Sequence, residues 1–514
     1  MLLFLPTSIL TLSLLAILVS LRLDADARRN WLIASAGAGL AWFSMLFLRV
    51  RLPLAGQTPG FSVLTFNQYQ LNWQMDGVAW SLLFAFLSYY LIFTLSQVTV
   101  FSDRENNYWL LSILSAILAG VSALAANPLA LLILWFFVDM LALFWLRSDN
   151  RAAQIPNSWQ MGFSINLVAI ALLVWLWLSF PISSLAFDSL NAGILLTVVL
   201  LRVGLLPLHI TKFPSGQNDD AGEIFASLAA MFPALVVLPR LSFLLPFSFP
   251  IYYWLLLACL LIFALKWFIS ESFGQGSAYF LLLTMGFAAL FSINDSQNGS
   301  LHWLFILMLV AGLLPLFEQI SVYRIAIYAL GVWLISPFSF SPNFSSAIFF
   351  TNASWISSLM FLLSLSLLIA GWLRHTRGLK VVSSRLESWQ RSVFFGTVIL
   401  SVLLLILLPL GLLPLTYANV QPPPIWALAA IALGAAALYY FAPRIDPYIR
   451  FAGDFAERVI AVDWHARWIT RAWEIATPGL RIFTRLLEGS SGILWALLLV
   501  VLMLSLISQL ASGG

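Results

Sequence analysis

Charged side chains are scarce in this 514-residue chain, because Asp, Glu, Lys and Arg together make up 9% of it while hydrophobic residues make up 61%. Soluble domains carry about 25% charged residues. Apolar runs long enough to cross a bilayer follow one another almost from end to end. The composition therefore excludes a soluble domain with a single anchor and predicts an all-α, polytopic membrane protein.

Cysteine is also nearly absent. The single Cys259 excludes an intrachain disulfide and a multi-cysteine metal or iron–sulfur site. The chain has no glycine-rich phosphate loop and no cluster of His, Cys and carboxylates. Asp219, Asp220 and Glu223 lie close together, but they open a predicted helix, where acidic residues suit the N-terminus. We expect no catalytic site, cofactor or metal in this chain, and whether it belongs to an enzyme complex stays open.

We predict sixteen membrane spans, each from an apolar run of roughly 20 residues. The first has neither a preceding charged region nor a small-residue cleavage site, so we interpret it as a span and not as a signal peptide. The predicted spans are 2–22, 31–49, 77–98, 108–125, 127–146, 160–180, 191–211, 223–242, 251–269, 277–293, 301–317, 323–338, 353–373, 393–415, 424–442 and 492–511.

The distribution of basic residues predicts the orientation. The segment 374–391 carries Arg374, Arg377, Lys380, Arg385 and Arg391, so it is expected on the cytoplasmic side. Counting back through the spans places the N-terminus outside. The loops that this count places outside contain almost no Lys or Arg beyond Arg51. The net charge of +4 thus reflects membrane-flanking residues and not nucleic-acid binding. We expect a bacterial or archaeal cytoplasmic membrane and contact with lipid.

Residues 443–490 differ from the rest of the chain. Phe451, Phe455, Val459 and Val462 recur at helical spacing, and charged residues fill other positions. This pattern predicts an amphipathic lateral helix on the cytoplasmic surface. The helix either rests on lipid alone or braces its own bundle or a neighbouring subunit. The predicted domains are therefore a transmembrane bundle (1–442), a lateral helix (443–490) and a C-terminal span (491–514).

Two charges lie deep in apolar segments of the first half. Arg202 is in LLRVGLLPLHI, residues 200–210, and Asp139 is in ILWFFVDMLALFWL. Ionisable residues at this depth usually face a partner or a wet cavity. The sequence therefore suggests an intramembrane ion pair between them. The alternative is that the Arg202 side chain extends to the membrane surface.

Four segments, in their order and spacing, resemble the antiporter-like membrane subunits of respiratory complex I, membrane-bound hydrogenases and multi-subunit cation/proton antiporters. The segments are QMDGVAWSLLFAFL (74–87), residues 110–141, RVGLLPLH (202–209) and AYFLLLTMGF (278–287). The lateral helix resembles, in shorter form, that of the distal large complex I subunit. The resemblance implies partners among other membrane subunits, including further antiporter-like ones. It also implies that Asp139 and Arg202 replace a glutamate/lysine pair, and that His209 and His302 match family histidines.

The departures from that family bear on mechanism. The lysine of the eighth span falls near Phe232 or Pro233, Ile306 occupies another lysine position, and residues 325–373 contain no Asp, Glu, Lys, Arg or His. A relay lysine must lose its proton, whereas arginine stays protonated in proteins. Arg202 can therefore hold Asp139 but not shuttle a proton. His209 and His302 can titrate, but no lysine or carboxylate links them, which favours a structural role.

Three hypotheses follow. The first is a membrane subunit of a complex I-like or related assembly in which proton translocation by this chain is reduced or lost. The second is an active ion-coupled transporter subunit, for example of an inorganic-carbon uptake or cation/proton antiporter system. The third is a membrane enzyme such as a lipid-linked transferase, which the short outer loops disfavour because they offer few acidic or histidine groups.

Overall fold

A computed structural model describes most of the chain in fifteen stretches. They are residues 2–23, 26–57, 71–99, 106–148, 157–179, 189–206, 221–241, 250–270, 273–294, 297–317, 324–337, 341, 343–378, 387–407 and 424–460. His209, the predicted span 492–511 and the greater part of the predicted lateral helix lie outside the described residues. The chain divides into two compact units, Met1–Phe455 and Ala456–Gly514, and the account below concerns the first.

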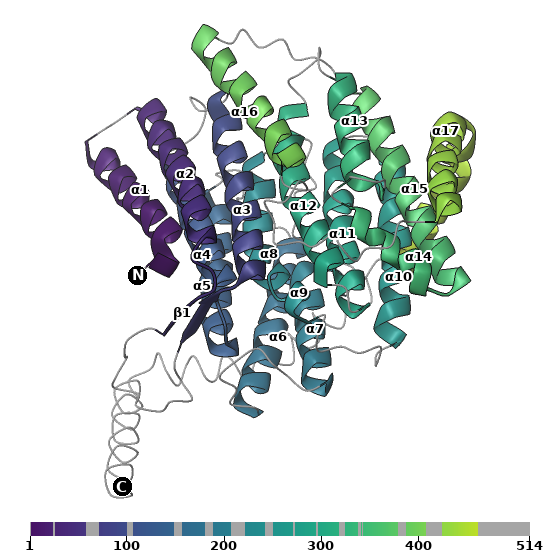
Figure 1. The fold of residues 1–514 in the computed structure, drawn as a ribbon, viewed down its shortest axis with the longest axis horizontal. Helices are drawn as coiled ribbons and strands as arrows, with labels where there is room; N and C mark the ends of the chain where they lie inside the picture. Colours follow the sequence, from purple (N-terminus) through teal and green to yellow (C-terminus); the bar gives the residue numbers. More distant parts are fainter. Residues whose placement is uncertain are drawn as a thin grey trace, which may run out of the picture. The chain divides into compact units, whose positions relative to one another are not determined.

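The described part of this unit is built almost entirely from helices (Figure 1). Eight helices in it are long and apolar enough to cross a membrane, and shorter apolar helices accompany them. The helices are α1 (Leu5–Arg22), α2 (Ala27–Arg49), α3 (Gly77–Ser96), α4 (Asn106–Ala123), α5 (Pro128–Ser148), α6 (Asn157–Ser179), α7 (Ser189–Val203), α8 (Ala221–Leu235), α9 (Leu238–Leu241), α10 (Pro250–Ile269), α11 (Phe273–Ile293), α12 (Gln297–Phe317), α13 (Arg324–Ile335), α14 (Ile348–Asn352), α15 (Trp355–Gly378), α16 (Ser388–Leu407) and α17 (Ile425–Ile460).

The predicted all-α membrane architecture is confirmed. Each predicted span from 2–22 to 424–442 coincides with a helix, although the eighth is divided between α8 and α9. The total of sixteen stays a prediction. The predicted domain boundary at 442–443 falls inside α17, which continues through Pro443 and Pro447. The division into bundle and lateral helix also stays a prediction.

Neighbouring helices pack through apolar and small residues. The closest-packed pairs include α10 with α15, α10 with α11, α11 with α12, and α12 with α3. Gly331 of α13 lies against the Trp372 ring of α15, and Gly371 of α15 lies against the Trp267 ring of α10. Because glycine has no Cβ, it lets these bulky rings lie against the neighbouring backbone, as small residues do at membrane helix interfaces.

A two-stranded antiparallel sheet interrupts the helical pattern. Strand β1 (Leu54–Gln57) pairs with β2 (Asn72–Met75), with Leu54 opposite Met75. The backbone of β2 also bonds the connection between α4 and α5, where Gln74 N donates to Leu124 O at 2.8 Å and Ala126 N donates to Asn72 O at 2.9 Å. The sequence did not predict this hairpin, since strands this short carry too little alternation to stand out from a loop.

Candidate functional site

Asp139 of α5 and Arg202 of α7 form a two-pronged ion pair inside the bundle. Arg202 Nη1 donates to Asp139 Oδ2 at 2.9 Å, and Arg202 Nη2 donates to Asp139 Oδ1 at 2.8 Å. Two parallel N–H···O bonds are the strongest geometry that a guanidinium and a carboxylate can adopt. The pair therefore fixes α5 to α7 at one defined register.

Both partners are removed from solvent, with exposed side-chain fractions of 1% for Arg202 and 4% for Asp139. Such burial is expensive unless further hydrogen bonds satisfy both groups. Asn166 Nδ2 of α6 donates to Asp139 Oδ1 at 3.1 Å, and Arg202 Nη2 donates to the Trp135 carbonyl at 3.2 Å. The guanidinium carbon also lies 4.6 Å from the centre of the Trp135 ring, a cation–π contact. Three helices thus supply one polar cluster, in which Arg202 Nε and Asn166 Oδ1 make no hydrogen bond within the described residues.

The end of α7 explains how the sequence places Arg202 here. The helix stops at Val203, before the predicted end of the span at residue 211, and Gly204 adopts φ 91°. Its N–H bonds Leu200 O at 3.1 Å, and the next N–H bonds the same carbonyl at 3.0 Å. Glycine reaches this left-handed conformation without the Cβ penalty of other residues, and it commonly ends helices this way. Arg202 lies in the last turn, where a cation complements the helix dipole.

Aromatic rings fill the interior between α3 and α8. Phe232 stacks on Phe86 with ring centres 4.5 Å apart, and Phe225 stacks on Phe93 at 4.5 Å. Tyr90 packs on Phe225 at 5.3 Å. These five residues, here called the aromatic cluster, are all at most 1% exposed. Phe232 occupies the region where the family resemblance implies a lysine, so apolar packing replaces a titratable group there.

In the second half of the chain, side chains without a fixed charge fill the interior around α11 and α12. Ile306 of α12 is fully buried, and His302, one turn earlier on the same helix, is 2% exposed. Ser292 Oγ of α11 donates to Leu238 O at 2.8 Å and to Ser300 Oγ at 2.9 Å. His302 is not among the hydrogen-bond partners of Asp139 and Arg202.

A second, looser ion pair lies beside the hairpin. Arg240 Nη2 of α9 is 3.9 Å from Asp76 Oδ1, and Arg240 Nη1 donates to Ala125 O at 2.8 Å. Asp76 also accepts from Ala79 N at 2.7 Å and so caps α3. These contacts join α3, α9 and the connection between α4 and α5 at one end of the bundle.

Solved structures with this arrangement of helices are membrane complexes. A chain of the Mrp complex from Dietzia sp. DQ12-45-1b superposes with TM-score 0.66 and 14% identity, over 99% of this chain and 63% of that one. A chain of the membrane-bound sulfane sulfur reductase, an archaeal respiratory membrane complex, gives 0.65 and 13% over 97% and 99%. A chain of NADH-bound respiratory complex I from Thermus thermophilus gives 0.57 and 19% over 85% and 98%.

The chain shares its fold with these chains of membrane complexes. The resemblance seen in the sequence motifs is thus confirmed at the level of the fold. This chain spans less than two thirds of the Mrp chain that it matches, and nearly the full length of the other two. No protein-family model and no curated protein sequence matches it.

Within this fold, the structure brings two of the four predicted site residues together, Asp139 and Arg202. His302 lies elsewhere, on α12, and His209 is outside the described residues. Sequence reasoning missed Asn166 and Trp135, and it did not pair Asp76 with Arg240. Asn166 left a usable signal, since an amide inside the apolar run SINLVAIALL needs a hydrogen-bond partner in a membrane.

Proposed function

We propose that the chain is a membrane subunit of a multi-subunit proton- or ion-translocating assembly, and that it has lost most or all proton translocation of its own. The observation that carries this proposal is the buried, two-pronged bond between Asp139 and a cation that keeps its proton. Arginine does not deprotonate in proteins, so the Arg202 position cannot pass a proton onward as lysine can.

The surroundings of the pair support the same conclusion. Asp139 accepts three hydrogen bonds, two from Arg202 and one from Asn166, and the pair as a whole is neutral. Beyond it, the aromatic cluster occupies the interior between α3 and α8. Proton transfer requires titratable groups or water within hydrogen-bond reach of one another. The four phenylalanine rings of the cluster carry no group that could pass a proton, and Tyr90 supplies its one hydroxyl.

The proposed partners are other membrane subunits, including further antiporter-like chains. The fold neighbours belong to multi-subunit membrane complexes, which supports this part of the proposal. In such an assembly the Asp139–Arg202 pair would serve to link α5 and α7 rigidly without carrying protons.

We further propose an outside N-terminus in a bacterial or archaeal cytoplasmic membrane. Contacts between predicted cytoplasmic segments support the orientation. Arg28 lies 4.5 Å above the Trp389 ring, and Gln390 Nε2 donates to Val98 O at 3.3 Å. These contacts bring together three segments that the distribution of Lys and Arg assigns to one side.

The decisive experiment measures protons moved per turnover by the intact host assembly in liposomes. The variant is the double substitution Asp139→Leu with Arg202→Leu, which removes both charges and leaves neither buried without its partner. We expect the proton stoichiometry to stay unchanged as long as the assembly remains whole, which gel filtration checks. A lower stoichiometry in an intact assembly would contradict the loss of translocation.

The retained ion pair favours one second candidate, an active ion-coupled transporter subunit. Under that alternative, Asp139→Asn abolishes proton or cation flux while leaving the subunit assembled. Purification in mild detergent, with identification of every co-purifying chain, distinguishes between the two kinds of host assembly. Recovery with other antiporter-like subunits and a redox arm indicates a respiratory-type assembly, whereas recovery with one soluble partner indicates a small uptake system.

A further inference from the structure

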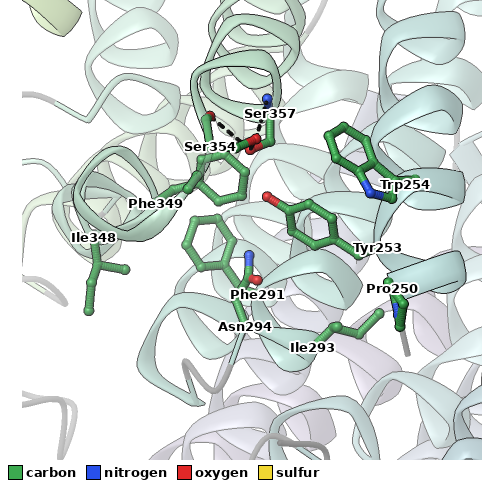
Figure 2. Close-up of a pocket in the computed structure, with 11 residues that line it drawn as sticks. Pro250, Tyr253, Trp254, Phe291, Ile293, Asn294, Ile348, Phe349, Ser354 and Ser357 are labelled. Carbon is green, nitrogen blue, oxygen red and sulfur yellow. Dashed lines mark hydrogen bonds between the residues drawn. The ribbon is translucent and has the colours of Figure 1, made fainter. Parts of the chain in front are cut away.

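A cavity of about 250 Å³ lies at one end of the bundle, among helix ends that are far apart in the sequence (Figure 2). It is bounded by the start of α10, the end of α11, and the α14 segment with the start of α15. By the predicted orientation these ends face the outer side of the membrane. This volume can hold roughly eight groups of the size of a water molecule.

Aromatic rings form much of the wall. Tyr253 of α10 stacks on Phe349 of α14 at 6.4 Å, and Phe291 of α11 meets Phe349 edge to face at 6.1 Å. Phe349 is held from behind by Phe361, at 4.2 Å. Figure 2 shows Tyr253, Phe291 and Phe349 gathered around one space. Because each ring is fixed by another, the cavity has an apolar wall of defined shape.

The remaining lining is polar but uncharged. Asn294 contributes an amide, and Ser354 and Ser357 contribute hydroxyls that are 2.8 Å apart. Ser357 Oγ also donates to the Ser354 carbonyl at 2.9 Å. Among the described residues that line the cavity, none is Asp, Glu, Lys, Arg or His. The site therefore suits a ligand with an apolar portion and neutral hydrogen-bonding groups, and its described lining has no cation to pair with a phosphate.

The cavity reaches the surface beside exposed apolar side chains. Trp254 lines it and is itself 42% exposed, and the neighbouring Ile251 and Trp355 are 78% and 76% exposed. Exposed Trp and Tyr at helix ends are typical of the level where lipid headgroups meet the acyl chains. From the predicted spans we therefore expect phospholipid around the cavity at this level.

We propose that this cavity binds part of one acyl chain of a phospholipid, with the ester region at the Asn294 and Ser354 side. The aromatic wall matches methylene groups, the amide and hydroxyls match ester carbonyls, and the described lining has no cation that would draw the phosphate inward. This assignment is independent of the proposed function, since it rests on the α10, α11, α14 and α15 ends and not on the ion pair.

The test uses the full chain in its host assembly, in vesicles that contain phosphatidylglycerol with a photoactivatable diazirine midway along one acyl chain. After illumination, mass spectrometry locates the adducts. We expect peptides with residues 250–254 and 348–357 to carry about tenfold more label than the exposed face of α2, which corresponds to roughly 1.4 kcal/mol in affinity.

Two variants obstruct the cavity, Ala353→Trp in its lining and Ser354→Trp at a more exposed position. Either is expected to reduce that label to the level of α2. The matched control is Ala36→Trp on the exposed face of α2, which should leave it unchanged. Equal labelling of all lipid-facing helices, or labelling that both obstructing variants leave intact, would overturn the proposal. Stronger labelling of the same peptides by a photoactivatable quinone than by the phospholipid would also overturn it.

Discussion

The helices α7 and α13 are both short as described, and the polar side chains near their ends make different bonds. They have 15 and 12 residues, or about 22 and 18 Å of helix against a hydrocarbon core of roughly 30 Å. Charged Arg202 lies in the last turn of α7. Beyond α13, neutral side chains bond the last carbonyls, with Asn343 Nδ2 donating to Ile335 O and Ser341 Oγ donating to Ser336 O at 2.6 Å.

The comparison shows that the charges of Asp139 and Arg202 are not needed to close a helix end. A buried helix end can be closed by an amide and a hydroxyl, as at α13. The guanidinium of Arg202 bonds Asp139 and the Trp135 carbonyl of α5, and none of its bonds goes to the end of α7. Its charge therefore links two helices, whereas Asn343 and Ser341 bond carbonyls at the end of a single helix.

The largest effect is expected from Arg202→Ala. This change leaves the Asp139 carboxylate buried with Asn166 as its remaining partner, and a broken buried ion pair costs about 3–5 kcal/mol. Thermal unfolding of the detergent-solubilised assembly, followed by tryptophan fluorescence, measures the loss. The double variant Asp139→Leu with Arg202→Leu should lose much less. Equal losses in the single and the double variant would show that the charges contribute nothing beyond their volume.

A smaller loss is expected from Asn343→Ala in the neutral half. The change removes the donor to Ile335 O and the acceptor for Ser346 Oγ, and it leaves buried polar groups without bonds at about 1–3 kcal/mol. The same unfolding assay measures it. Ser392→Ala, on the exposed side of α16, removes a hydroxyl that bonds its own helix and should have almost no effect. If Asn343→Ala leaves the thermal unfolding unchanged, α13 does not depend on these hydrogen bonds for its stability.

The break of α7 is expected to depend on Gly204. Alanine at φ 91° costs roughly 1–2 kcal/mol, since a Cβ clashes with the backbone in left-handed conformations. The matched control is Gly396→Ala in α16, where a Cβ meets no atom within 4 Å and alanine favours the helix by about 0.5–1 kcal/mol. If Gly204→Ala lowers the free energy of unfolding and Gly396→Ala raises it, the effect comes from the backbone conformation at Gly204 and not from the loss of a glycine. If Gly204→Ala makes the protein more stable, the left-handed conformation that ends α7 at Val203 would be contradicted.

The smallest effect is expected from Asp76→Asn in the looser ion pair. The Arg240–Asp76 distance is 3.9 Å and Asp76 is one-third exposed, so losing the charge should cost less than about 1 kcal/mol. Asparagine still caps α3, whereas Asp76→Ala also loses the bond to Ala79 N and should cost about 1 kcal/mol more. A loss for Asp76→Asn as large as that for Arg202→Ala would remove the distinction between the two pairs.

The sequence was sufficient for the architecture because membrane insertion depends on local runs of apolar residues. Every predicted span within the described residues coincides with a helix. The depth of Asp139 and Arg202 in such runs was equally visible, since a charge in an apolar segment is expensive whatever surrounds it. The chemical reason why Arg202 cannot relay protons was also readable from residue identity alone.

Tertiary packing decided which side chains meet. Asn166 and Trp135 complete the ion pair only because α5, α6 and α7 pack together, and no local pattern specifies that packing. Besides β1, the backbone of β2 bonds Leu124 and Ala126, which are more than 40 residues away in the connection between α4 and α5. The aromatic cavity likewise combines Tyr253, Phe291 and Phe349 from three separate helices. Apolar runs determine that a helix enters the membrane, but shape and hydrogen bonding between helices determine its neighbours.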